Sequence, residues 1–130
     1  MNYLDERNRN KLVAALRAGL LAVVGDTFTG KGILLGRRYS VDSESHPGDP
    51  YTTEVVWFWA GGMELRCSCP WGTDHGPFTM GSTPCKHCLL ALFTSLPPLA
   101  RTAVIRADAG LSRALQEGLP AMRQRQAVHY

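Results

Sequence analysis

The chain has 130 residues, of which 45% are hydrophobic and 19% are charged, and its formal net charge at pH 7 is +3. A chain of this length can bury a substantial core, so we expect one globular domain over residues 1–130. The composition excludes a membrane-spanning protein, because no apolar stretch reaches the roughly 20 residues that a spanning helix needs, and the mild charge does not by itself indicate a nucleic-acid-binding protein.

The first predicted element is an amphipathic helix over residues 4–24. Leu12, Leu16 and Leu20 recur at four-residue intervals with alanines between them, which is the spacing of one helical face. Gly25 follows the apolar run and is expected to end the helix.

Residues 27–67 have the composition of a small antiparallel sheet. Runs of β-branched and aromatic residues alternate with turn residues, and Gly61-Gly62 is a hairpin signal between the last two runs. The polar stretch 43–50 is expected to be a solvated loop. The runs expected as strands are 27–29, 33–35, 39–41, 53–60 and 63–67.

The rest of the chain has helical patterns. A second helix is expected to begin at Thr83, with Pro84 at its first position, and to stop before Pro97. Residues 99–130 also alternate apolar and charged side chains in helical fashion, and the polar end, 118–130, is expected to be a flexible tail. The sequence therefore predicts an α+β fold: a small antiparallel sheet flanked by N-terminal and C-terminal helices.

All four cysteines and two of the four histidines lie between residues 67 and 88. The N-terminus has no basic flank and apolar core of a secretion signal, so we expect a reducing compartment, the cytoplasm or the nucleoid or nucleus, where cysteine clusters bind metal or do redox chemistry. Fifteen residues separate two pairs of donors, one closing a strand and one opening a helix, and thiolates with imidazole select zinc. The pairs are Cys67 with Cys69 and Cys85 with His87.

These segments, CSCP at 67–70 and CKH at 85–87, resemble the SWIM zinc finger, whose pattern is C-x-C followed at a distance by C-x-H. The resemblance covers residues 51–97 and implies a ββα finger with one structural zinc per chain. The layout is most similar to the small single-domain SWIM proteins of the Shu complex type, which partner RecA-family recombinase paralogues in homologous recombination. The stretch GRRYSV at 36–41 resembles their GRRxYxV strand, although it lacks one residue before Tyr39.

The fourth ligand has an alternative. On a regular helix Cys88 shares a face with Cys85 and His87 points away, which favours a site of four cysteines. The family pattern favours His87, because Cys85 can lie in the irregular turn before the helix. We expect His87 as the ligand, Cys88 as a core residue and His75 as an ordinary loop histidine.

Three enzyme motifs are incomplete. The PCKHC segment at 84–88 matches half of a zinc deaminase, but no His-x-Glu or Cys-x-Glu supplies the proton carrier. GDTFTGKG at 25–32 ends in glycine where a phosphate loop needs Ser or Thr. A redox role for Cys85 and Cys88 would need a thioredoxin-like βαβ context. We therefore expect a protein that is not an enzyme, with a zinc filled by four protein ligands.

Two roles follow from the remaining surface. The first is a docking adaptor, since the apolar helices and the aromatic strand 53–60 leave surface for a protein partner, such as a RecA-family ATPase paralogue, or for self-association. The second is direct DNA contact in recombination or repair. The alternative is an accessory subunit of another nucleic-acid or transposon-related assembly. The candidate DNA-binding residues are Arg37, Arg38, Arg66 and Lys86.

Overall fold

The computed structural model describes residues 5–79 and 81–129. These residues form an α+β fold with four strands and five helices. The strands make one antiparallel sheet in the order β1-β2-β3-β4, so each pairs with its neighbour in the chain. In chain order the elements are α1 Glu6–Arg17, β1 Ala22–Gly30, β2 Ile33–Val41, β3 Tyr51–Phe58, β4 Met63–Cys67, α2 Pro70–His75, α3 Lys86–Ser95, α4 Pro98–Arg106 and α5 Ala109–His129.

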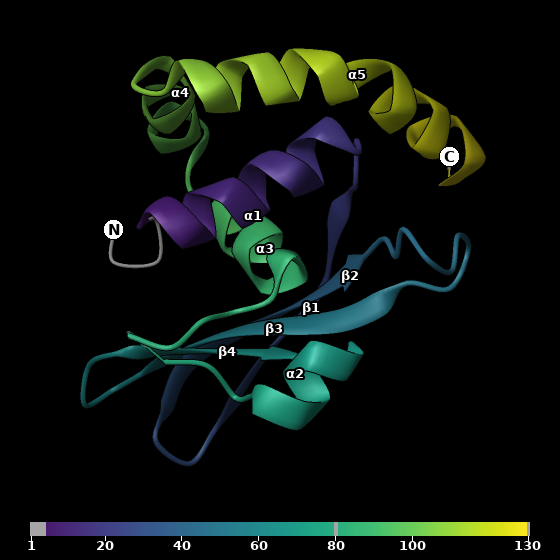
Figure 1. The fold of residues 1–130 in the computed structure, drawn as a ribbon. Helices are drawn as coiled ribbons and strands as arrows, with labels where there is room; N and C mark the ends of the chain where they lie inside the picture. The colour runs from purple at the N-terminus through teal and green to yellow at the C-terminus, as the bar shows by residue number, and fades with distance from the viewer. Residues whose placement is uncertain (1–4, 80, 130) are drawn as a thin grey trace.

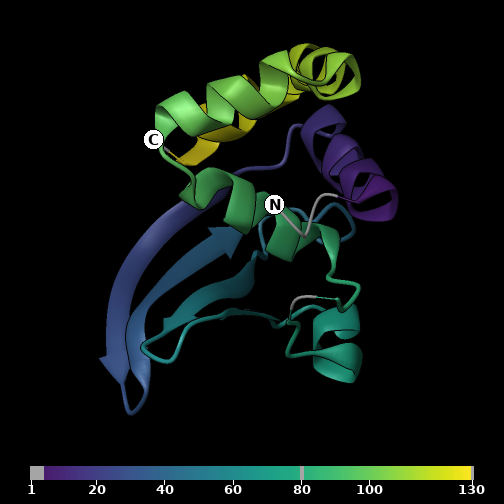
Figure 2. The same ribbon diagram turned by 90° about the vertical axis from the view of Figure 1, so that its left-hand side faces the viewer.

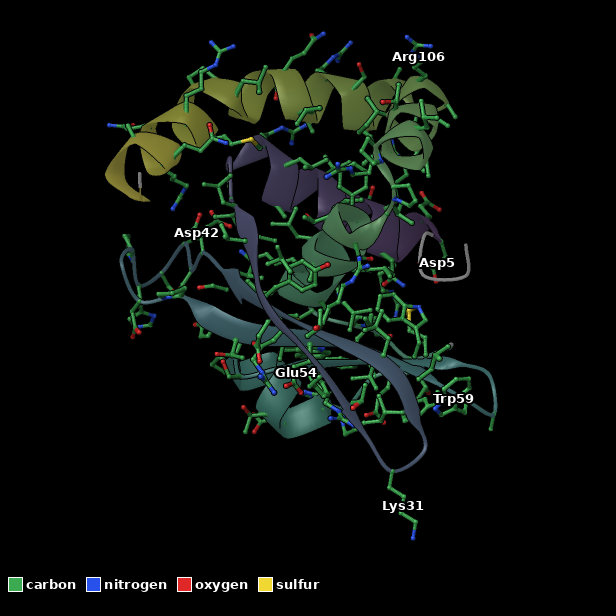
Figure 3. All side chains as sticks on the ribbon, turned by 180° about the vertical axis from the view of Figure 1, so that it is seen from behind. Asp5, Lys31, Asp42, Glu54, Trp59 and Arg106 are labelled. Carbon is green, nitrogen blue, oxygen red and sulfur yellow. The ribbon has the colours of Figure 1, made fainter. Side chains whose placement is uncertain are left out.

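Four of the helices, α1, α3, α4 and α5, are stacked on one side of the sheet. Figure 1 shows α3 and α1 above the sheet, α4 and α5 as a further layer above α1, and the short α2 beside β4. Figure 2 shows the sheet curving beneath these helices. The β1–β2 turn points away from this stack, and Figure 3 shows Lys31 projecting from it.

The core lies between the sheet and α3. The buried apolar residues form one cluster that joins α1, the inner face of the sheet, α3 and α5. Seven consecutive residues of α3, from His87 to Phe93, are buried, so this helix is enclosed on every side. Its packing is therefore what holds the sheet against the helical layers.

Helix α1 is shorter than the sequence suggested, and the expectation of a helix to residue 24 is wrong. The helix begins after Asp5, whose carboxylate accepts from the Asn8 amide at 2.9 Å, and ends at Arg17. Gly19, at φ 70°, closes it: its amide donates to the Leu16 carbonyl and the Leu20 amide to the Ala15 carbonyl. The following valines start β1.

The C-terminal segment continues as helix. Residues 118–129, the part expected as a flexible tail, form the last turns of α5, which passes through Pro120. Figure 1 shows α5 bending toward its C-terminal end. Gly118 packs directly on the end of α1, where an added Cβ would overlap the Leu16 carbonyl oxygen. This close approach ties α5 to α1 beyond the point where sequence pattern predicts helix.

The hairpin turn expected at Gly61-Gly62 is present. Gly61 and Gly62 have positive φ, and the Gly61 amide donates to the Phe58 carbonyl at 3.0 Å, so β3 returns as β4. The polar stretch 43–50 connects β2 with β3 outside the sheet, as expected. No helix among residues 5–79 and 81–129 is long and apolar enough to cross a membrane.

Candidate metal centre

Two of the predicted ligands lie where β4 passes into α2. Cys67 is the last residue of β4, and Cys69 is the N-cap of α2. The Gly72 amide donates to the Cys69 sulfur at 3.2 Å. Gly72 is needed here because a Cβ would overlap the Cys67 carbonyl oxygen. The tight turn therefore brings both sulfurs to one place and supplies a donor to one of them.

The other two ligands lie at the start of α3. Cys85 is its N-cap, with extended backbone at φ −72° and ψ 164°, and His87 is in the first turn. The helix thus begins at Lys86, later than the start at Thr83 that the sequence suggested. Because Cys85 is outside the helix, helical spacing does not separate it from His87. The Lys11 ammonium, from α1, donates to the Pro84 carbonyl at 2.7 Å and anchors the segment before Cys85.

The structure brings the four predicted ligands together. Their ligand atoms all lie within 4.8 Å of one another, and all four side chains are buried. The four cysteines of the chain are free thiols. These residues are positioned to bind one metal ion, and they form the only such group of His, Cys, Asp or Glu in the described part of the chain. The group consists of Cys67, Cys69, Cys85 and His87.

His87 carries an observation that favours a metal. Its Nδ1 atom is fully buried and has no hydrogen-bond partner among the described residues. A buried ring nitrogen without a partner costs free energy, and a bound cation would supply the missing interaction. The ring is held in place by Tyr51, whose centroid lies 4.7 Å away. The donor set of three sulfurs and one imidazole is one that structural zinc sites use.

Without a cation, the pKa values of the three sulfurs shift in opposite directions: that of Cys67 is lowered, and those of Cys69 and Cys85 are raised. A hydrogen bond from the Cys85 thiol lowers the pKa of Cys67, and the same contact raises the pKa of Cys85. Burial raises the pKa of Cys69. The Thr53 hydroxyl donates to the Cys67 sulfur at 3.4 Å and also favours its thiolate. Crowded sulfurs cannot all ionise together unless a positive charge lies between them, which is the condition that a divalent metal meets.

Cys88 lies against this group without belonging to it. Its side chain is completely buried, and its contact with Cys67 raises the pKa of the Cys88 thiol. The described four-residue group contains His87 in its place. Cys88 is therefore a fourth sulfur, at the edge of a centre made of three sulfurs and one imidazole.

His46 and His75 lie outside the group of four donors and have other contacts. His75 stacks on Trp71 with the ring centroids 3.7 Å apart, and His46 contacts the Ser45 hydroxyl at 3.1 Å. Trp71 donates its indole N–H to the Thr83 carbonyl at 3.0 Å, which closes the loop between the two ligand pairs. The loop thus has aromatic and backbone bonds of its own.

An open pocket of about 470 Å³ borders the centre. Three ligands, Cys69, Cys85 and His87, form part of its wall, and the rings of Tyr51 and Trp71 form another part. Since these ligands are nevertheless almost completely buried, the pocket reaches the outer side of the centre rather than its sulfur-lined interior.

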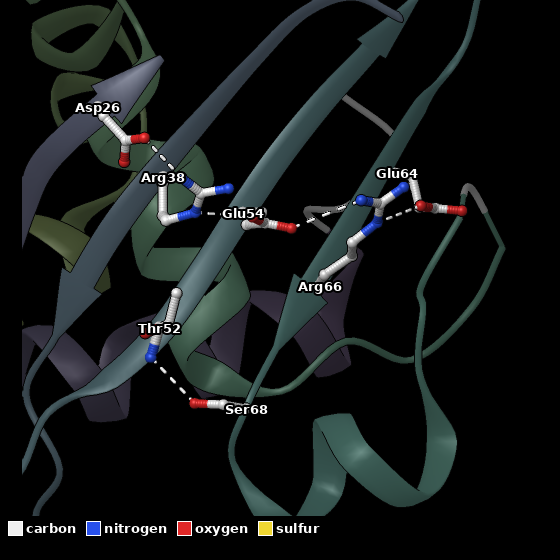
Figure 4. Close-up of polar contacts among 7 residues, drawn as sticks. All are labelled: Asp26, Arg38, Thr52, Glu54, Glu64, Arg66 and Ser68. Carbon is white, nitrogen blue, oxygen red and sulfur yellow. Dashed lines mark hydrogen bonds and ion pairs between the residues drawn. The ribbon is translucent and has the colours of Figure 1, made fainter. Parts of the chain in front are cut away.

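The four predicted DNA-binding residues are not gathered into one cationic surface. Arg38 pairs with Asp26 at 2.5 Å and Glu54 at 2.9 Å, while Arg66 pairs with Glu64 at 2.6 Å and Glu54 at 3.5 Å, and Figure 4 shows these four ion pairs in a row across the sheet. The row arises because Arg38, Glu54 and Arg66 face one another in the strand register.

The remaining two candidates lie elsewhere. Lys86 pairs with Glu44 at 2.5 Å beside the metal centre. Arg37 precedes Arg38 on the same strand but lies on the opposite face, over the Trp57 ring at 5.8 Å. Three of the four candidate cations are therefore paired with carboxylates.

Sequence reasoning missed the residues that support the ligands. Thr53 and Tyr51 come from β3, and no local pattern links them to the cysteines 14 or more positions later. The signal that could have found Thr53 is strand register, because Thr53 pairs directly with Cys67 once the hairpin at residues 61–62 is fixed. For Gly72, the only signal in the sequence is that a glycine follows closely after Cys67 and Cys69; its packing against Cys67 is visible only in the structure.

No protein-family model matches this chain, and no curated protein or solved structure matches it either.

Proposed function

We propose that this chain is a SWIM-like, zinc-stabilised adaptor that takes part in DNA recombination or repair without catalysing a reaction. The observation that carries the proposal is the closed set of four buried donors at Cys67, Cys69, Cys85 and His87. Bound there, zinc would supply a cross-link between the end of β4 and the start of α3.

The geometry supports a structural rather than a catalytic metal. Four protein ligands complete the tetrahedral shell of zinc and leave no position for an activated water. The Gly72 amide and the Thr53 hydroxyl already donate to two of the sulfurs, as outer partners of a metal site do. The chain's own residues thus orient the ligands and exclude water from them.

The role in recombination or repair rests on the resemblance at residues 67–70 and 85–87 and on the hairpin and helix that flank them. In this proposal the partner is a protein, such as a RecA-family ATPase paralogue. DNA contact is the secondary part, because a phosphate would have to compete with Glu54 for Arg38 and Arg66, whereas Arg37 has no carboxylate partner among the described residues.

The first test is elemental analysis of protein purified under reducing conditions. One zinc per chain is expected, lost in a Cys69→Ala variant and retained in an Asp26→Ala variant as a control on the far face of the sheet. Protein without stoichiometric zinc, or with these thiols oxidised to one another, would contradict the proposal.

The second test separates the adaptor from DNA binding. A pull-down from the native host is expected to recover RecA-family ATPases with the wild-type chain. Binding to a labelled DNA duplex, measured over a salt series, is expected to weaken in an Arg37→Glu, Arg38→Glu double variant. Recovery of bare nucleic acid without any protein would leave the adaptor role without support and favour direct DNA binding.

A further inference from the structure

Two adjoining hollows lie between the upper helical layer and the rest of the protein. One, of about 560 Å³, is lined by residues of α1, α3, α4 and α5, and the other, of about 490 Å³, by residues of β1, β2, α4 and α5. They share Leu21, Ala22, Thr94 and Arg101. We call the two together the layer groove. It lies away from the metal centre, and none of the four metal ligands lines it.

The floor of the layer groove is apolar. Leu16, Leu90 and Phe93, all buried or nearly so, form the deepest wall of the larger hollow. Ile105 and Leu115 approach from α4 and α5 and are only half-buried. Helix α4 has no buried residue at all, so the layer above the groove does not close onto it. Apolar surface of this kind is stabilised when another apolar surface covers it.

The lining is positively charged and contains no acidic residue. Arg37 lies in the smaller hollow, Arg106 in the larger one, and Arg101 in both. Arg101, Arg106 and Arg37 make no ion pair with any described residue, and the Arg37 guanidinium lies over the Trp57 ring. This differs from Arg38 and Arg66, which the sheet neutralises with its own carboxylates. The groove therefore offers guanidinium groups to an anion that the chain itself does not supply.

We propose that the layer groove binds an acidic, amphipathic segment of a protein partner. Its apolar side chains would cover the leucines and Phe93, and its carboxylates would pair with Arg101 and Arg37. This inference rests on the adaptor role proposed above and assigns that role a surface.

The chemistry of the groove disfavours the other occupants. A fatty acid has a single carboxylate, whereas the arginines are distributed over two hollows. A nucleic acid has no apolar side chains to cover the floor. A second copy of this chain would present α4, with Arg101 and Arg106 and no acidic residue, or α5, with one Glu against three Arg, so the charges would repel.

The experiment selects a peptide without assuming its identity. A phage-displayed library of random 16-residue peptides is panned against the full chain in its metal-loaded form, and the most enriched peptide is made with a fluorescein label. We expect enriched sequences that combine Asp or Glu with apolar residues at helical spacing. The Arg101→Glu variant should bind the labelled peptide at least about tenfold more weakly, and Arg101→Gln should have a smaller effect.

The matched control is Arg113→Glu, an exposed arginine of α5 outside the groove lining, which should leave the affinity within about twofold. Circular dichroism and zinc content establish that each variant is folded. Enrichment of peptides without acidic residues, or equal binding by Arg101→Glu and wild type, would overturn the proposal.

Two further readouts exclude the other occupants. The first readout is binding of the fluorescent fatty acid cis-parinaric acid. If it binds saturably, blocks the peptide and is lost in Arg101→Glu, and if the library yields no acidic peptides, the groove binds a lipid and the proposal is overturned. A dimer in sedimentation velocity that Arg101→Glu dissociates would assign it to a second copy. If the native-host ATPase is still captured by Arg101→Glu, only the groove assignment fails; if no protein partner exists, the adaptor role fails with it.

Discussion

Helices α3 and α4 follow each other in the chain and are nearly equal in length, 10 and 9 residues, but seven residues of α3 are buried and none of α4 is. Helix α3 starts at the metal centre and packs on the sheet below and α1 above. Helix α4 is linked to the molecule through α5 and leaves an open groove beneath it.

The difference lies in what fixes the start of each helix. Helix α3 begins directly after Cys85, one of the four candidate ligands, so that a bound metal would hold the start of the helix to the end of β4. Helix α4 begins after Pro97 with Pro98 at its first position, and no side-chain hydrogen bond caps its start. We infer that α3 is held rigidly by its buried contacts and that α4 keeps its surface exposed to solvent. The following predictions test this contrast.

Metal removal is expected to have the largest effect. Structural zinc contributes about 10–16 kcal/mol in zinc-finger peptides, and a typical protein has about 5–15 kcal/mol of total stability. Chelation under reducing conditions should therefore abolish amide protection in β4 and α3, while α5 should lose much less. Hydrogen exchange with mass spectrometry measures both in one experiment, and equal loss in α3 and α5 would contradict a local role for the centre.

Substituting the two candidates for the fourth ligand should have unequal effects. His87→Ala removes a donor, so zinc should be lost or bound much more weakly, and the α3 region should open. Cys88→Ala removes only a buried side chain and should keep one zinc per chain at a cost of about 1 to 2 kcal/mol in unfolding free energy. Competition with a zinc-binding dye measures the affinity of each variant, and the opposite order would assign Cys88 as the ligand.

The contact between α5 and α1 can be broken without touching the metal. In Gly118→Ala the new methyl group meets the Leu16 carbonyl, so the unfolding free energy should fall by about 1 to 3 kcal/mol while zinc content stays at one per chain. Urea unfolding measures the change. The control, Gln116→Ala on the exposed side of α5, should shift stability by less than about 0.5 kcal/mol.

The smallest expected effect is on how the thermal stability of the contact between α1 and α5 depends on pH. Arg9 forms a two-bonded ion pair with Asp108, which also caps α5 through the Gly110 and Leu111 amides, and the Arg9 hydrogen bond lowers the pKa of Asp108 to about 2. Because the folded pKa lies below the usual value of about 3.9, the stabilisation is fully present above about pH 5 and is lost as the pH falls toward 2.

The wild type should accordingly have a higher Tm than Asp108→Asn at pH 6, with the difference shrinking as the pH approaches 2. Thermal unfolding of both proteins across this range measures it, and Glu117→Gln, which removes another inter-helix ion pair, provides the comparison. If the difference in Tm between the two proteins does not change with pH, the hydrogen bonds by which Asp108 caps α5, and not its ion pair with Arg9, stabilise the contact between α1 and α5.

Much of the sheet and the candidate site could be predicted because their signals are local. The glycine pair at 61–62 predicts a hairpin, and β3 and β4 form around it. Residue type and spacing pointed to Cys67, Cys69 and Cys85 and left His87 and Cys88 as alternatives, between which the SWIM resemblance favoured His87; the structure brings the atoms of the set with His87 within 4.8 Å. The N-cap position of Cys85 was also anticipated as the reason for preferring His87.

Other features could not be predicted because they depend on residues far apart in the chain. Periodicity continued the first helix to residue 24, but Gly19 ends it next to Gly118, about a hundred positions later. Arg38 and Arg66 were predicted as candidate DNA-binding residues, but strand register places Glu54 between them. Polar composition suggested a loose end, whereas α5 continues to His129.

The sequence by itself determined the α+β class, the hairpin at residues 61–62 and the cluster of candidate metal donors, since turn residues and donor atoms act over a few neighbouring positions. Only the tertiary structure decided which cations are neutralised, where α1 stops, and that α4 stands over an arginine-lined groove. Each of these depends on what a residue meets across the fold, and such contacts are set by packing and register rather than by the local pattern of side chains.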